Sequence, residues 1–147
     1  MEILAREDKV ISHLIGGFMQ KIAEVFVVLD NVPGTISSLL RGLKKKNYSI
    51  RAVGLFVDSA RLYLDEPEKA LKTIQENGYT AELREVLCVD LPNKKGNLSE
   101  LTQKLANAKI NINYMYGTML EKQRSGLLIL EVDQPDLAVE LFRNHKY

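Results

Sequence analysis

The residues best suited to bind a small molecule form a turn between an apolar strand and a helix. The stretch Asp30–Leu40 reads DNVPGTISSLL and follows the strand-like run VFVVL at Val25–Leu29. Backbone N–H groups at the start of a helix are unsatisfied and carry partial positive charge, so they can hold a carboxylate. Gly34 permits a positive φ and a close approach of a ligand to the backbone. The side-chain amide of Asn31 adds a donor and an acceptor.

The same pattern occurs twice in the chain. Glu24–Ile50 aligns with Val86–Ile112 at a constant offset, so that Asn31 falls on Asn93 and Gly34 on Gly96. Further along, Leu64–Ile74 matches Val132–Phe142 at a slightly longer offset, because the second copy has gained residues around Glu121–Gly126. A charged insertion that ends in glycine is tolerated best at a hairpin tip. The sequence therefore predicts a duplicated unit.

Each copy is predicted to contain a strand, a helix, two strands, a second helix and a closing strand. The first helix has an apolar face at spacings of three, four and seven, formed by Ile36, Leu39, Leu40 and Leu43. Asp65 is expected to cap the helix that begins at Pro67. Thr80–Leu83 is the expected closing strand of copy one, and in copy two this strand is expected to be short or missing. The predicted class is α+β: two ferredoxin-like βαββαβ units in tandem, with antiparallel sheets and helices on one face.

The expected boundaries follow from the repeat. Repeat one covers residues 19–84 and repeat two covers residues 85–147, while residues 1–18 lie outside both. Two hypotheses account for this extension: its apolar residues form a helix, or translation begins at Met19 and the segment is not native. The intact mass of protein made from the native upstream DNA tests the second hypothesis. The other face of the first sheet, to which Tyr63, Val53, Leu55 and Val57 are assigned, is not fully polar, which favours association.

The turns resemble those of the ACT domain, a small regulatory module. The resemblance rests on a strand followed by Asn-x-Pro-Gly, an apolar residue two positions later, and the Ile-Asn-Ile opening of a strand at Ile110–Ile112. It extends over Glu24–Tyr147 and implies a tandem ACT protein. In that family, two domains commonly join their sheets and bind amino acids where the turn of one meets a strand of the other. The resemblance implies a ligand-binding set at the interface between ACT units: Asn31, Gly34, Thr35, Ile36, Asn93, Gly96, Asn97, Leu98 and Asn111.

The two copies depart from the family pattern at different positions. Ser49 stands in copy one where Asn111 stands in copy two, and Lys95 replaces the proline before Gly96. The two half-sites are therefore expected to be unequal. The alternative is that these residues have a structural role only: the glycines adopt a backbone conformation that other residues disfavour, and Asn31 caps the helix.

Other kinds of site have little support. His13 and His145 lie near opposite ends, no His/Cys spacing suits a metal, and no phosphate-binding glycine pattern occurs. The basic cluster Lys44–Lys46, with Arg41 and Arg51, is interpreted as a solvated helix end, because a nucleic-acid surface needs aromatic residues and a larger field. The net charge of +1 gives no general attraction to nucleic acid or to an anionic membrane.

The sequence thus predicts a non-catalytic regulatory protein, without a cofactor, that binds an amino acid or a related metabolite. The single cysteine, Cys88, favours a cytoplasmic location, and no apolar run approaches the ~18 residues of a membrane span. The expected partners are a second copy, as a homodimer, and a metabolic enzyme. The alternative function is a ligand-free oligomerisation module or an accessory subunit of such an enzyme.

Overall fold

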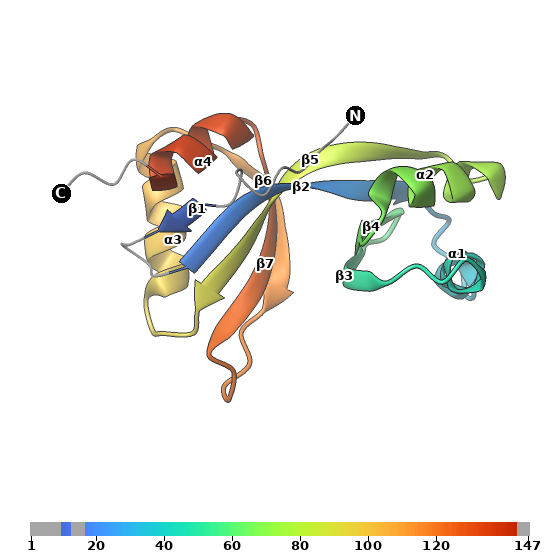
Figure 1. Ribbon diagram of the computed structural model, residues 1–147, viewed down its shortest axis with the longest axis horizontal. Coiled ribbons are helices and arrows are strands. Elements are labelled where there is room, and N and C mark those ends of the chain that lie inside the picture. The colour runs from blue at the N-terminus through green and yellow to red at the C-terminus, as the bar shows by residue number, and fades with distance from the viewer. Residues whose placement is uncertain (1–9, 13–16, 144–147) are drawn as a thin grey trace. The chain divides into compact units, whose positions relative to one another are not determined.

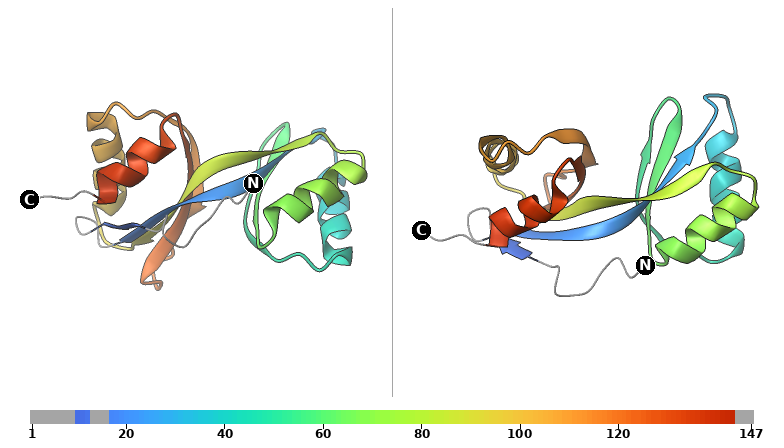
Figure 2. Two further views of the ribbon diagram at one scale, coloured as in Figure 1. Left: turned by 45° about the horizontal axis from the view of Figure 1, so that its top comes forward. Right: turned by 90° about the horizontal axis from the view of Figure 1, so that it is seen from above.

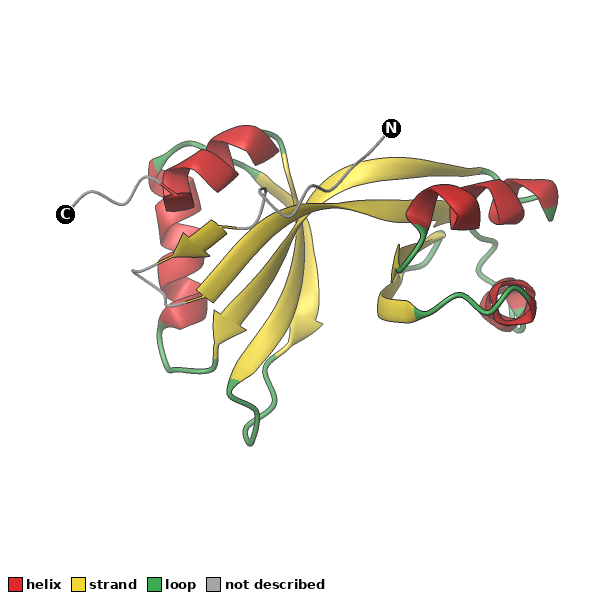
Figure 3. Cartoon of the chain, in the orientation of Figure 1, coloured by secondary structure: helices red, strands yellow, loops and turns green. Residues whose placement is uncertain are grey.

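The computed structural model describes residues 10–12 and 17–143 and has the expected α+β composition (Figure 1). These residues form seven strands and four helices, which are coloured separately in Figure 3. The strands are β1 (Val10–Ser12), β2 (Gly17–Val28), β3 (Ile50–Leu55), β4 (Ser59–Leu64), β5 (Ala81–Pro92), β6 (Ile112–Thr118) and β7 (Ser125–Val132). The helices are α1 (Thr35–Lys45), α2 (Pro67–Glu76), α3 (Asn97–Asn107) and α4 (Pro135–Arg143).

The chain forms two compact units whose boundaries fall inside strands. Ala23–Arg84 forms one, here called the first-repeat unit, and the described residues before Ala23 together with those from Glu85 to Arg143 form the other, the second-repeat unit. One boundary lies within β2 and the other within β5. The second-repeat unit is therefore discontinuous in sequence, and the first-repeat unit lies between its two pieces.

The first-repeat unit has the strand order β3-β4-β2-β5. Val25 and Val27 of β2 pair with Leu62 and Ala60 of β4, so these apolar side chains share one face. Both helices bury their apolar stripes against this face, and Figure 2 shows α1 and α2 side by side. The predicted periodicity of the first helix is confirmed, since Leu39 and Leu43 are its buried residues.

Two apolar residues of the edge strand β3 lie on a different face from the one expected. Val53 pairs with Leu62 and Leu55 with Ala60, so both lie on the helix-bearing face rather than the open one. They nevertheless remain 50% and 53% exposed. An irregularity in the register between Ile50 and Ala52 accompanies this placement, and the periodicity of a strand alone does not reveal such a shift.

Arginine side chains cover aromatic rings on the open face of the same sheet. The Arg61 guanidinium lies 4.9 Å from the ring centre of Phe26, and that of Arg84 lies 3.8 Å from the same centre. Arg61 also forms an ion pair with the fully buried Glu24 at 3.7 Å. Cation–π contacts of this kind reduce the aromatic surface that the sheet exposes to water.

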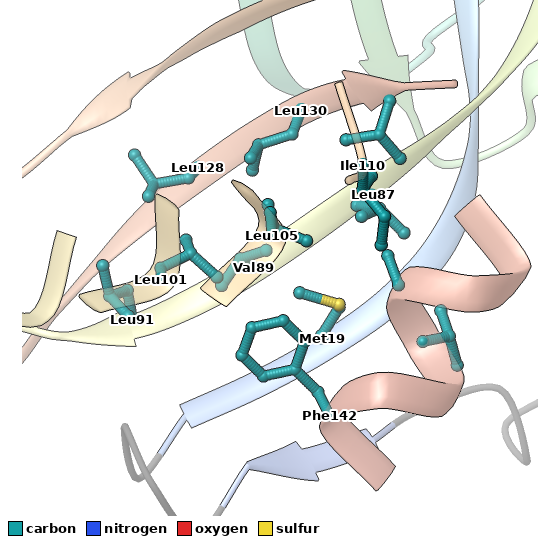
Figure 4. Close-up of a cluster of buried hydrophobic side chains, with 13 residues drawn as sticks. Met19, Leu87, Val89, Leu91, Leu101, Leu105, Ile110, Leu128, Leu130 and Phe142 are labelled. Atoms are coloured by element: carbon teal, nitrogen blue, oxygen red, sulfur yellow. The ribbon is translucent and has the colours of Figure 1, made fainter. Parts of the chain in front are cut away.

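The second-repeat unit has the strand order β2-β5-β7-β6. The start of β2 occupies the position of the closing strand that was expected to be short or missing in copy two. Met19 of β2 is 1% exposed and packs in one core with Leu87 and Phe142 (Figure 4). A Cβ at Gly17 would clash with the backbone oxygen of Asp90, so glycine permits β2 to run close to β5 at this position.

Part of the N-terminal extension belongs to the fold. Val10–Ser12 forms β1, which pairs with β2 through Val10–Met19, Ile11–Phe18 and Ser12–Gly17. The helix hypothesised for residues 1–18 is therefore wrong for residues 10–12 and 17–18. Residues 1–9 and 13–16 lie outside the described residues.

The expected helix cap at Asp65 is also wrong. Glu66 is the N-cap residue of α2 and makes no capping bond through its side chain. The Asp65 carboxylate instead accepts a hydrogen bond from the backbone N–H of Ser49 at 3.0 Å, and Asp133 does the same for Asn111 at 2.9 Å. In both copies this aspartate links the end of one strand to the residue that precedes another.

Candidate functional site

The first strand-to-helix turn depends on a glycine in the left-handed region. Gly34 has φ +91° and is the N-cap residue of α1, with no side-chain capping bond. A Cβ at this position would meet no atom within 4 Å, so the requirement for glycine is conformational. The Thr35 hydroxyl donates to the backbone oxygen of Asp30 at 2.9 Å, which closes the turn.

The second turn repeats the backbone geometry of the first. Gly96 also has φ +91°, and the Asn97 amide donates to the backbone oxygen of Pro92 at 2.9 Å, as Thr35 does to Asp30. The backbone N–H groups of Val32 and Lys94 each donate two residues back at 2.9 Å. Lys95 therefore replaces the proline of the first copy without altering the backbone bonds of the turn.

Alanine at Gly34 or at Gly96 is expected to lower the free energy of unfolding by about 1–2 kcal/mol, because an L-residue is strained at this φ. The two losses should be similar, since neither site adds a steric clash. Urea unfolding of the two variants measures them, with Ser37→Ala on the exposed part of α1 as the control. A large loss at only one of the two glycines would contradict this prediction.

A cavity of about 610 Å³ opens at the first turn, entirely within the first-repeat unit. It lies between the end of β2, the turn, the start of α1 and the segment Gly78–Thr80 that leads into β5. Gly34 and Thr35 of the predicted set line this cavity, and Asn31 and Ile36 do not. Asn31 is exposed to solvent, whereas Ile36 packs against the core.

The cavity combines groups that match both ends of an amino acid. The start of α1 supplies backbone N–H groups and partial positive charge, which suit a carboxylate. Asp30 is a lining residue that carries a carboxylate, a group that suits an ammonium ion. Ser38, Tyr79 and Thr80 add hydroxyl groups to the lining.

Asp30 and the segment Gly78–Thr80 line the cavity but were not among the predicted ligand-binding residues. The predicted topology could have identified Gly78–Thr80 as a neighbour of the first turn, because a ferredoxin-like order places the closing strand beside the first strand. The structure shows this neighbour relation directly: the Val28 N–H donates to the Thr80 carbonyl at 2.9 Å. Tyr79 is thereby brought to the turn from a distant part of the chain.

The second turn differs in its side chains. The Asn93 amide donates to the backbone oxygens of Leu120 at 2.6 Å and Gln123 at 3.2 Å, in the inserted hairpin between β6 and β7. Its donor capacity is therefore used within the fold. Pro92 occupies the position of Asp30, so this turn has no carboxylate there. Leu98, at the start of α3, is 37% exposed.

Asn111 lies away from Asn93 within the second-repeat unit. It precedes β6, and its side chain donates to Oδ1 of Asn113 at 2.9 Å. Asn93 contacts the chain beyond the other end of β6, and a strand of this length separates the two asparagines by roughly 20 Å. The unit therefore does not bring the two together around one ligand.

A family model described as an ACT domain pair matches residues 19–147. The chain belongs to the ACT domain pair family. The expectation drawn from the two turns is thus confirmed, and the ACT domain pair is a regulatory module. Among curated proteins, no sequence matches the chain.

Solved structures of low sequence identity share the fold. Protein BT0572 from Bacteroides thetaiotaomicron has a TM-score of 0.74 at 21% identity, covering 82% of this chain and 85% of its own. The regulatory subunit of aspartate kinase from Thermus flavus has a TM-score of 0.61 at 12% identity, covering 84% and 94%. Aspartokinase III from E. coli, in complex with lysine and aspartate, has a TM-score of 0.57 at 14% identity, covering 93% of this chain and 33% of its own.

Proposed function

We propose that this ACT domain pair binds a free amino acid, or a metabolite with the same ammonium and carboxylate groups, in the cavity at its first turn. The observation that carries the proposal is the convergence of Asp30, the start of α1 and Tyr79 around one cavity. Its volume of about 610 Å³ is in the range of small-molecule sites, which is roughly 300–1,000 Å³. The similar E. coli enzyme was solved in complex with two amino acids, which supports this ligand class.

The proposed role is regulatory. Ligand binding would change the assembly of the protein or its contact with a metabolic enzyme, since a ligand shifts the state that it binds more tightly. The second turn is left out of the proposed site, because it lacks the carboxylate and uses the Asn93 donors internally. No helix among the described residues is long and apolar enough to cross a bilayer, and these residues hold no cluster of metal ligands.

Thermal unfolding in the presence of each of the twenty amino acids tests the proposal. A ligand at 100 times its dissociation constant adds about 2.7 kcal/mol of stability. At about 10 mM ligand, one amino acid is therefore expected to raise the Tm by roughly 5–10 °C. Twenty unchanged transitions would contradict binding of a common amino acid.

A ligand-free oligomerisation module is the second candidate. It is favoured by the exposed apolar residues of the edge strand β3, Val53 and Leu55, because an unpaired apolar edge is suited to pairing with a second copy. Sedimentation of the protein without ligand tests this candidate. A homodimer that Val53→Lys dissociates would support it, and a monomer at all concentrations would contradict it.

A further inference from the structure

A second cavity of the first-repeat unit, of about 380 Å³, lies between the C-terminal ends of α1 and α2. These helices are neighbours in the fold (Figure 2). The first helix contributes Arg41, Lys45 and its C-cap residue Lys46, and the second helix and the chain after it contribute Thr73, Asn77 and Tyr79. The function proposed above makes no use of the cationic residues.

Helix geometry brings the cations to this cavity. Arg41 and Lys45 are one turn apart on α1 and so lie on the same side of the helix. Gly42 also lines the cavity and lies beside the side-chain amide of Asn77. A Cβ added at position 42 would be 2.9 Å from Asn77 Nδ2. A glycine within a helix costs about 1 kcal/mol relative to alanine. Here it lets the end of α2 approach α1 closely.

The lining is strongly positive. Its three cations are accompanied by no carboxylate. Among the described residues, no carboxylate lies within ion-pair distance of Arg41, Lys45 or Lys46, whereas Lys69 at the start of α2 is 3.0 Å from Glu66. Because the whole chain carries a net charge of only +1, the cavity is a local concentration of positive charge.

Compensation of the helix dipole does not account for this arrangement. A dipole favours any lysine in the last turn, and Lys44 and Lys45 both lie there. Only Lys45 of these two lines the cavity, and it does so with Arg41 from the preceding turn. The cations therefore converge on one space rather than being distributed around the helix end.

The neutral groups of the cavity favour an anion with several oxygen atoms. Thr73, Asn77 and Tyr79 form this side of the lining, and the Thr73 hydroxyl shares a hydrogen bond at 3.1 Å with the hydroxyl of Tyr48, which lies outside the lining. A guanidinium presents paired donors that match phosphate oxygens, and ammonium groups add point charges. We propose that this cavity binds a small phosphorylated metabolite, with its phosphate group held by Arg41, Lys45 and Lys46.

Titration of the full-length, ¹⁵N-labelled protein tests this site. The probes are inorganic phosphate and glycerol 3-phosphate, with sodium chloride at equal ionic strength as the reference. Saturable shifts are expected for the amides of the last two turns of α1 and of residues 73–79. The double variant Arg41→Gln/Lys45→Gln is expected to weaken binding about tenfold or more, since it removes two charge-assisted contacts.

Two further variants make the test specific. Lys44→Gln/Lys72→Gln removes the same charge from neighbouring positions that do not line the cavity, and it should bind phosphate like the parent protein. Gly42→Ala keeps the charge and narrows the cavity, so it should weaken glycerol 3-phosphate more than inorganic phosphate.

Three results would overturn the proposal. The first is a set of shifts that do not saturate, and the second is an equal loss of binding in both charge variants. The third is tighter binding of a single-stranded oligothymidylate that Lys44→Gln/Lys72→Gln weakens, which would indicate an extended nucleic-acid surface instead.

Discussion

Replacing Met19 with alanine is expected to lower the free energy of unfolding by about 2–5 kcal/mol, although the sequence pattern gives no sign of such a role. Met19 is 1% exposed in the core of the second-repeat unit, where it lies close to Phe142 of α4 (Figure 4). The substitution removes most of this side chain and leaves a cavity between β2 and α4. Because β2 supplies the closing strand of this unit, we expect the damage to appear there first.

Urea unfolding measures the loss, and hydrogen exchange of the α4 amides locates it. Leu137→Ala is the control in the same unit, because Leu137 is 40% exposed and alanine is a good helix former. The control should lose less than about 1 kcal/mol. Similar losses in the two variants, or unchanged exchange in α4, would show that the start of β2 does not complete this core.

Replacing Asp30 with asparagine is expected to weaken amino-acid binding about tenfold or more. The amino acid is the one that raises the Tm in the thermal screen, so this experiment rests on the proposed function. The change keeps the size of the side chain and removes the charge that would hold the ligand's ammonium group. Asp30 is exposed and its backbone oxygen still accepts the Thr35 hydroxyl, so the turn itself should be preserved.

Isothermal titration calorimetry of the variant and the parent protein measures this difference. Asp58→Asn is the matched control, since it removes the same charge from the β3–β4 hairpin and does not line the cavity. It should bind the amino acid with unchanged affinity. An Asp30→Asn variant that binds as tightly as the control would remove Asp30 from the site.

The local features of the fold could be predicted from the sequence, and the strand that closes the sheet of the second-repeat unit could not. Apolar periodicity and the two glycines identified the helices and turns, because both signals act over a few residues. The start of β2 has no counterpart in the repeat, so Gly17 and Phe18 were assigned to an extension. Strand partners are chosen by contacts between distant residues, which a local pattern does not contain.

For the candidate site too, the residues of the local turn could be predicted and those brought in by the sheet could not. Gly34 and Thr35 were identified because the turn is local, and both line the first cavity. Tyr79 was missed because only the sheet brings it to the turn. The asparagines of the second copy were chosen by resemblance, and their side chains form hydrogen bonds within the second-repeat unit.

In the sequence, the first-repeat unit lies between the two segments of the second-repeat unit, and this order has a consequence for synthesis on the ribosome. All strands and helices of the first-repeat unit lie within Ala23–Arg84, so this unit can fold as soon as that segment has emerged. Residues 17–22 are made earlier and can pair on one side with β1, yet β5, their partner on the other side, is completed only with the residues after Glu85. The side of this strand that pairs with β5 must therefore remain unpaired in the nascent chain until the C-terminal half arrives, and an unpaired strand edge is prone to aggregation unless a chaperone protects it.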